Sequence, residues 1–172
     1  SGSGTFTITA SSSASFDSAL NVLFTSQTST MTNIGAMKVI DDRVTTPGWT
    51  LAISGQDWAK LNQGGAGEHP NQLDYDGTGS DGNLGKLCPK PNNGTLYAEA
   101  GSLTGVTKGT NQCFSAGVSS ITVVSATNGN GHGTYWLTDM PAEQFFPSNP
   151  TAQSYTTTIT FTLSSLFDIF TV

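Results

Sequence analysis

Charged side chains are scarce in this sequence. Only 10% of its 172 residues are Asp, Glu, Lys or Arg, whereas an average soluble domain has roughly a quarter. Thr, Ser, Gly and Asn take their place, so the sequence predicts a surface that is polar but uncharged. The six Lys and Arg residues are outnumbered by twelve Asp and Glu and do not cluster. This distribution argues against nucleic acid or anionic lipid as a partner.

Long apolar runs are missing too. No stretch approaches the ~18 residues needed to cross a bilayer, so we expect no membrane span. The chain starts at Ser1 with neither Met nor a signal peptide, as a processed secretory protein would. Its hydrophobic content of 35%, with three Trp and nine Phe, is enough to build a core. We therefore expect residues 1–172 to form one folded domain.

The usual marks of catalysis are absent from the sequence. His69 and His132 both lie in Gly-rich stretches that are typical of loops. No serine stands in a Gly-x-Ser-x-Gly motif, which would mark a hydrolase nucleophile. We predict that the protein is not an enzyme. A pair of carboxylates that meet only in the folded chain, as in glycosidases, is the alternative that the sequence leaves open.

Only two cysteines are present, Cys88 and Cys113, separated by 25 residues. With no Cys-x-x-Cys motif and no nearby His, a zinc site is not indicated. We predict a disulfide, with two free thiols as the alternative, and hence a secreted protein of the extracellular space or cell surface. Asn93-Gly94-Thr95, between the cysteines, is a sequon that predicts glycosylation of Asn93.

Alternation of apolar and polar residues predicts β-strands. The predicted strands are residues 5–10, 49–53, 121–124, 135–137 and 155–163. In the last of them, Thr occupies every even position and mainly apolar residues the odd ones. Such a two-faced strand is typical of an antiparallel sheet with one solvated side.

The residues between the predicted strands favour tight turns. Asp-Gly and Asn-Gly dipeptides recur there, and they tolerate the positive φ that such turns need. Short helical turns are expected only in residues 57–61 and 141–146. The predicted fold is an all-β antiparallel β-sandwich, jelly-roll or immunoglobulin-like with Greek-key connections. Residues 62–117 are expected to be a long, Gly-rich loop excursion that the disulfide holds in place.

One Gly-rich stretch, residues 74–83, carries several oxygen-bearing side chains. Calcium takes six to eight oxygen ligands, and Asx residues at near-alternate positions supply them. The predicted calcium ligands are Asp74, Asp76, Asp81 and Asn83. A solvated turn is the alternative, because Asp and Gly are also the residues that turns prefer.

Three stretches resemble the WxL-type surface domains of bacteria. Residues 47–54 contain a Trp-x-Leu segment. Residues 131–142 combine Gly-His-Gly-Thr-Tyr with Pro-Ala, and residues 153–163 are similar to the final Thr-rich strand of that family. The second Trp-x-Leu of the family is replaced here by Phe161-Thr162-Leu163. The resemblance implies a β-sandwich and a non-enzymatic extracellular surface protein.

The residues after the Thr-rich strand are strongly apolar. Such a segment tends to aggregate and to form β-strands when it is exposed. We therefore expect another part of the protein, or another copy, to cover it. Residues 164–172, or else 1–10, are predicted to act as a donor strand that completes a neighbouring copy. The predicted assembly residues are Leu166, Phe167, Ile169, Phe170 and Val172, with Phe6 and Ile8 at the other terminus.

The sequence as a whole thus predicts a secreted structural subunit that assembles head-to-tail with copies of itself into a filament. A carbohydrate- or cell-wall-binding module, with cell-wall or matrix glycans as partners, is the alternative. It would need exposed aromatic side chains. Trp49 and Trp136 stand in alternating strands and are expected in the core, which leaves Trp58 for a sugar platform.

Overall fold

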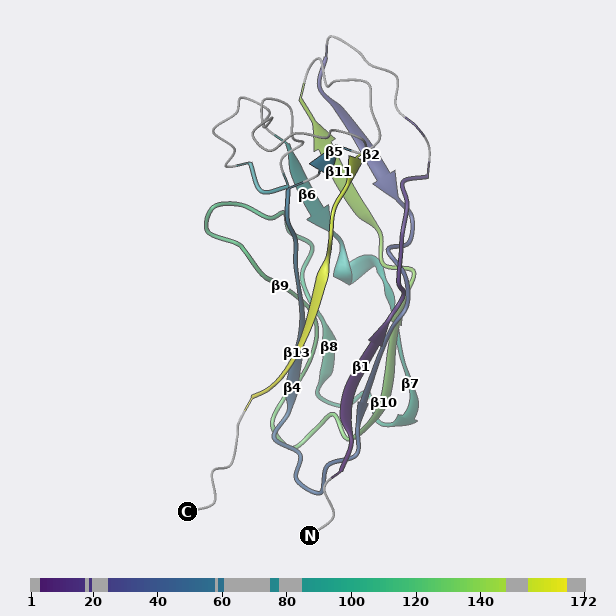
Figure 1. The fold of residues 1–172 in the computed structure, drawn as a ribbon. Coiled ribbons are helices and arrows are strands. Elements are labelled where there is room, and N and C mark those ends of the chain that lie inside the picture. Colours follow the sequence, from purple (N-terminus) through teal and green to yellow (C-terminus); the bar gives the residue numbers. More distant parts are fainter. Residues whose placement is uncertain are drawn as a thin grey trace.

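The computed structural model describes residues 4–17, 19, 25–57, 59–60, 75–77, 85–147 and 155–166 (Figure 1). All strand pairs in these residues are antiparallel, and the one helical element among them is a single 3-10 turn, η1 (Pro91–Asn93). The predicted all-β sandwich is therefore confirmed. Within the described part of the chain, no helix is long and apolar enough to span a membrane.

One layer of the sandwich consists of two sheets that share their strand order. The first contains β1 (Phe6–Ala10), β3 (Met37–Asp41), β10 (Gly133–Thr138) and β7 (Thr95–Gly101), in the order β1-β3-β10-β7. The second contains β2 (Gln27–Met31), β11 (Ala142–Phe146) and β6 (Lys86–Pro89), in the order β2-β11-β6. The pairs β2–β3, β10–β11 and β6–β7 are consecutive in the chain, so this layer is one long sheet interrupted at its middle.

The other layer is built in the same way. Its larger sheet has the order β13-β4-β9-β8, from β13 (Thr160–Ser165), β4 (Trp49–Ser54), β9 (Ile121–Ala126) and β8 (Val106–Lys108). Its smaller sheet pairs β12 (Tyr155–Thr156) with β5 (Ala59–Lys60). The two four-stranded sheets form what we call the proximal half, and the two smaller sheets the distal half. Figure 1 shows the two halves stacked along one long axis.

The core of the proximal half follows directly from the alternation in the sequence. In β4, Trp49, Leu51 and Ile53 are buried while the residues between them face outward, because successive side chains of a strand point to opposite faces. The indole Nε1 of Trp49 donates to the carbonyl of Gly131 at 3.0 Å. Its ring packs on Tyr135 of the opposite layer with centroids 5.7 Å apart.

The distal half has a less apolar interior. Ser29 of β2 and Gln144 of β11 are buried at 4% and 0% exposure, and both point between the layers. Their neighbour Ala142 adds little volume. The two halves are therefore filled unequally, with the large side chains concentrated in the proximal half.

The predicted helical turns are wrong. Residues 142–146 form β11, in which Ala142 and Gln144 alternate inward and pair with β2 and β6. Ala59 and Lys60 form β5, opposite β12. In both places the strand partners across the sheet outweigh a weak local preference for helix.

The predicted loop excursion at 62–117 is wrong for its second half. β6, η1, β7 and β8 all lie within it, and β7 and β6 are integral strands of the first layer. Residues 61–74 and 78–84 lie outside the described part of the chain. The strand predicted at 155–163 is divided into β12 and β13 by residues 157–159, although its alternation of half-buried and exposed positions is as predicted.

The predicted disulfide between Cys88 and Cys113 is confirmed. It ties the segment 112–114 along β6, where the amide of Phe114 donates to the carbonyl of Leu87 at 3.0 Å. Phe114 is fully buried. The disulfide thus closes the outer edge of β6 with a segment of the chain itself.

Removing this disulfide is expected to destabilise the fold. Cys88→Ala/Cys113→Ala should lower the free energy of unfolding by about 3 kcal/mol, because the unfolded chain regains the freedom of the closed loop. Urea denaturation followed by tryptophan fluorescence measures this loss. The unsubstituted protein in reductant is the control and should lose the same amount; an unchanged midpoint would contradict the role given to the bond.

Candidate functional site

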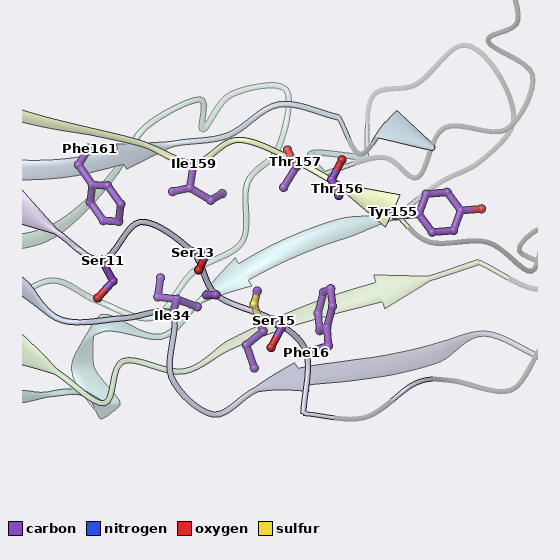
Figure 2. Close-up of a pocket in the computed structure, with 12 residues that line it drawn as sticks. Ser11, Ser13, Ser15, Phe16, Ile34, Tyr155, Thr156, Thr157, Ile159 and Phe161 are labelled. Carbon is purple, nitrogen blue, oxygen red and sulfur yellow. The ribbon is translucent and has the colours of Figure 1, made fainter. Parts of the chain in front are cut away.

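An apolar groove of about 470 Å³ opens between the two layers on the flank where β1 and β13 are the edge strands. Figure 2 shows Ile159 and Phe161 on one side of the space and Ile34 and Phe16 on the other. Two of its lining segments, 11–16 and 155–161, adjoin β1 and β13 in the chain, so the groove continues the edge that these strands form.

The groove exists because a run of small side chains follows β1. Residues 11–15 are Ser-Ser-Ser-Ala-Ser, and all five are exposed. The run is attached at both ends, by Ser11 N to the carbonyl of Ala36 at 3.1 Å and by Asp17 N to the carbonyl of Thr30 at 3.0 Å. Residues 11–15 themselves carry no large side chain that could fill the space, so Phe16, Met31 and Ile34 border an open groove.

Asp17 fixes the far end of this wall. Its carboxylate accepts from the backbone N–H of Thr32 at 2.9 Å and from the Thr32 hydroxyl at 2.5 Å. These two hydrogen bonds, the hydroxyl's first, lower the pKa of Asp17 below its ordinary value. The wall is thus held to β2 although it contains no strand.

The opposite wall is the edge of β12 and β13. Tyr155, Ile159 and Phe161 line the groove, while the Thr157 hydroxyl donates to the carbonyl of Gln56 at 2.6 Å and holds the interruption between the strands in place. In the described part of the chain, β13 pairs only with β4. Its second edge therefore borders the groove and can accept a further strand.

At the proximal end, Arg43 connects the two edge strands. Its guanidinium donates to both carboxylate oxygens of the buried Asp41 at 2.7 and 2.8 Å, and to the Ser165 hydroxyl at 3.0 Å. It also lies 3.7 Å from the ring centroid of Phe6. Immediately after β13, the amide of Leu166 donates to the carbonyl of Gly48 at 3.3 Å. The position of Leu166, the last described residue, is therefore firmly defined.

The predicted assembly residues at the two termini differ in their surroundings. Phe6 and Ile8 belong to β1, which pairs with β3 of the same chain, and both pack against this chain's own core. Leu166 is 44% exposed. Phe167, Ile169, Phe170 and Val172 lie outside the described residues.

The predicted calcium site can be examined only at Asp76, which is half-buried. Asp74, Asp81 and Asn83 lie outside the described residues. Among the residues that the structure does describe, no group of three or more His, Cys, Asp or Glu side chains is placed to hold a metal ion. Calcium binding at this loop stays a prediction.

Two other predicted positions are on the surface. Asn93, at the end of η1, is exposed, and its side-chain oxygen accepts from Asn111 at 2.8 Å. His132 is exposed as well; its carbonyl accepts a hydrogen bond from the Tyr135 hydroxyl at 3.0 Å. His69 is not among the described residues. Glycosylation of Asn93 stays a prediction.

Of the three tryptophans, Trp49 is in the core as predicted, whereas the core position predicted for Trp136 is wrong. Trp136 points outward from β10, because Tyr135 and Leu137 on either side of it are the buried positions. Trp58 lies outside the described residues. A half-buried tryptophan that points outward from a sheet can still offer its ring to a sugar, so the side chains around Trp136 decide what it can bind.

Two of those neighbours flank the Trp136 ring. Lys38 of β3 and Tyr97 of β7 are its cross-strand partners on opposite sides. The Lys38 ammonium lies 5.0 Å from the ring centroid, and the Tyr97 ring stacks at 6.4 Å with an interplanar angle of 12°. The Trp136 Nε1 donates to Glu99 at 2.8 Å. These cross-strand contacts hold the outer face of the sheet together and already engage the indole ring within the chain.

No family model matches this chain, and neither a curated protein nor a solved structure is significantly similar to it. The resemblance to WxL-type domains therefore stays a prediction. The groove and the neighbouring edge of β13 are the functional feature that sequence reasoning missed. The run of five small residues directly after an alternating strand is the sequence signal from which the groove could have been predicted.

The hydrogen bond between Trp136 and Glu99 leads to a testable prediction about the pKa of Glu99. The hydrogen bond from Trp136, and then that from Lys38, lower the pKa of Glu99. Trp136→Phe keeps the aromatic ring but removes the N–H, so the pKa of Glu99 should rise toward its ordinary value. Carboxyl-carbon NMR titration measures this, with Glu143 as the internal control. An unchanged Glu99 titration would show that the indole N–H does not act on this carboxylate.

Proposed function

We propose that this protein is a secreted structural subunit that assembles head-to-tail into a filament, donating residues 167–172 to the groove of the next copy. The observation that carries the proposal is the placement of two complementary parts. The groove lies toward the distal half, whereas Leu166, which the apolar segment follows in the sequence, lies at the proximal end.

The groove has the properties of a strand acceptor. One wall ends in the edge of β13, which supplies backbone hydrogen-bonding groups, and both walls supply apolar side chains. An added strand of six residues extends about 20 Å. Each large apolar side chain that it buries contributes about 1.5–3 kcal/mol, in addition to the backbone hydrogen bonds that it forms with β13.

The donor sequence has one favourable orientation. In an extended strand, Phe167 and Ile169 share one face and Asp168 and Phe170 the other. Burying Asp168 in an apolar groove without a partner would cost several kcal/mol. Phe167 and Ile169 therefore face into the acceptor, and Asp168 faces solvent.

A donor and an acceptor at opposite ends generate an open polymer. Such a head-to-tail contact is heterologous, so each added copy presents a new groove and the assembly does not close. Further apolar surface lies at the proximal end: Val44 is 84% exposed, Leu103 42% and Leu166 44%. Docking the next copy there would cover these side chains together with the segment.

Secretion fits this role. The disulfide favours an oxidising compartment, and a filament on the cell surface agrees with the expectation from the WxL resemblance. The sugar-binding alternative has less support, because the Trp136 ring is already engaged by Lys38 and Tyr97 of the same chain.

Deleting residues 167–172 should abolish filaments in negative-stain electron microscopy while leaving a folded monomer. The matched control is Phe170→Ser/Val172→Ser, which alters the outward face of the donor and should still assemble. Circular dichroism and size-exclusion chromatography verify the fold of each variant. Filaments formed by the deletion variant at normal length would refute donation by this segment.

The acceptor is tested separately with Ile159→Asp, which places a charge in the groove. This variant should add to the end of existing filaments but accept no further copy, so substoichiometric amounts should shorten filaments several-fold. Thr158→Asp is the control, because Thr158 is exposed and does not line the groove. Equal shortening by both variants would contradict the groove as the acceptor.

A further inference from the structure

The outer face of the sheet β13-β4-β9-β8 bears no charged side chain. The positions that point away from the core on its four strands are occupied by Thr and Ser with a single Ala. They are Thr160, Thr162, Ser164, Thr50, Ala52, Ser54, Thr122, Ser125 and Thr107. The net charge of −6 must therefore lie elsewhere on the molecule.

The strand register arranges these hydroxyls in rows. Ser164 is opposite Thr50, Thr50 is opposite Ser125, and Ser125 is opposite Thr107. One row of β-hydroxy side chains thus crosses all four strands. Because every side chain is small, no large group projects above the others.

The outer face of the opposite layer is different. It carries the ion pair between Lys38 and Glu99, with nitrogen and oxygen 3.3 Å apart, and the stacked rings of Tyr97 and Trp136. The outward positions of β13, β4, β9 and β8 carry no such charged or aromatic side chains.

We propose that the face of β13, β4, β9 and β8 is a lateral contact between copies of this chain, through which filaments bundle. Two copies of a negatively charged protein repel each other, and this face is where they can meet without bringing like charges together. Small side chains allow two sheets to approach to about 10 Å. Thr and Ser hydroxyls then pair across the contact. This inference rests on the proposed filament.

The chemistry of the face favours a second copy over a polysaccharide. Sugar rings bind proteins largely by stacking on aromatic side chains. No aromatic side chain is among the outward positions named above. A glycan could only form hydrogen bonds with the Thr and Ser hydroxyls of this face, and water competes well for those hydrogen bonds.

The test places charge on each outer face in turn. Thr107→Lys/Thr162→Lys alters the two edge strands of the proposed contact, and both residues are exposed. Thr7→Lys/Thr95→Lys is the matched control, since it alters the two exposed edge strands of the opposite face and adds the same charge. Electron microscopy measures bundle width, low-speed sedimentation measures bundled mass, and circular dichroism verifies the fold.

The first pair should leave single filaments of normal length and reduce the mass sedimented at low speed by about tenfold, an energy of about 1.4 kcal/mol. High salt should restore bundling, because it screens the added charge. The control pair should bundle normally. Normal bundling by the first pair, or equal loss in both, overturns the lateral contact while leaving the filament intact.

Two further outcomes have defined meanings. If sedimentation with insoluble cellulose is lost in the first pair while bundles persist, the face binds glycan and the inference is wrong. If the unsubstituted protein forms no filaments, the proposed function fails. The face is then judged by analytical ultracentrifugation: a dimer that Thr107→Lys/Thr162→Lys dissociates supports the contact, and a monomer overturns it.

Discussion

The packing of Trp49 against Tyr135 is the contact on which the two-layer arrangement depends. Each ring comes from a central strand of its own layer, and both are almost completely buried. Trp49 Nε1 reaches the carbonyl of Gly131, and the Tyr135 hydroxyl lies 3.0 Å from the carbonyls of Ser102 and His132. Burial, above all, raises the pKa of Tyr135. Only glycine fits at 131, where φ is +85° and a Cβ would lie 2.5 Å from the indole nitrogen. The pair thus fixes the layers and the proximal loops together.

The inward-facing side chains differ in size between the two halves of the molecule. Large side chains dominate the proximal half, while Ser29, Ala142 and Gln144 occupy inward positions of the distal half. The small residues 11–15 add to the same deficit on the open flank. On the opposite flank, the disulfide and Phe114 cover the edge of β6. The fold therefore protects one edge with its own chain and leaves the other available.

Periodicity in the sequence was sufficient to predict the strands whose side chains alternate clearly, such as β1, β4 and the residues of β12 and β13. Periodicity did not predict the elements whose conformation depends on residues far away in the sequence. β6 has only four residues and β7 ends in Ala-Glu-Ala-Gly, and the strand state of both depends on partners far along the chain. Pro141-Ala142-Glu143 suits a helix start by composition, but the register with β2 and β6 decides its conformation. Alternation also assigns residues to a shared face without saying which face is buried, which is why Trp136 was misplaced.

The groove depends on two segments about 145 residues apart in the sequence, roughly 11–16 and 155–161, and only the folded chain brings them together.

The course of β13 has a mechanical consequence. This strand runs along the long axis of the sandwich and ends at the proximal end, where Arg43 and Gly48 hold Ser165 and Leu166 (Figure 1). Tension applied through the residues that follow would pull parallel to the strand. All six residue pairs between β13 and β4 would then share the load in shear, rather than open one after another as when a hairpin is peeled apart. A chain joined to its neighbours at this point would therefore resist stretching through the backbone pairing of β13 with β4, although its described residues form few ion pairs.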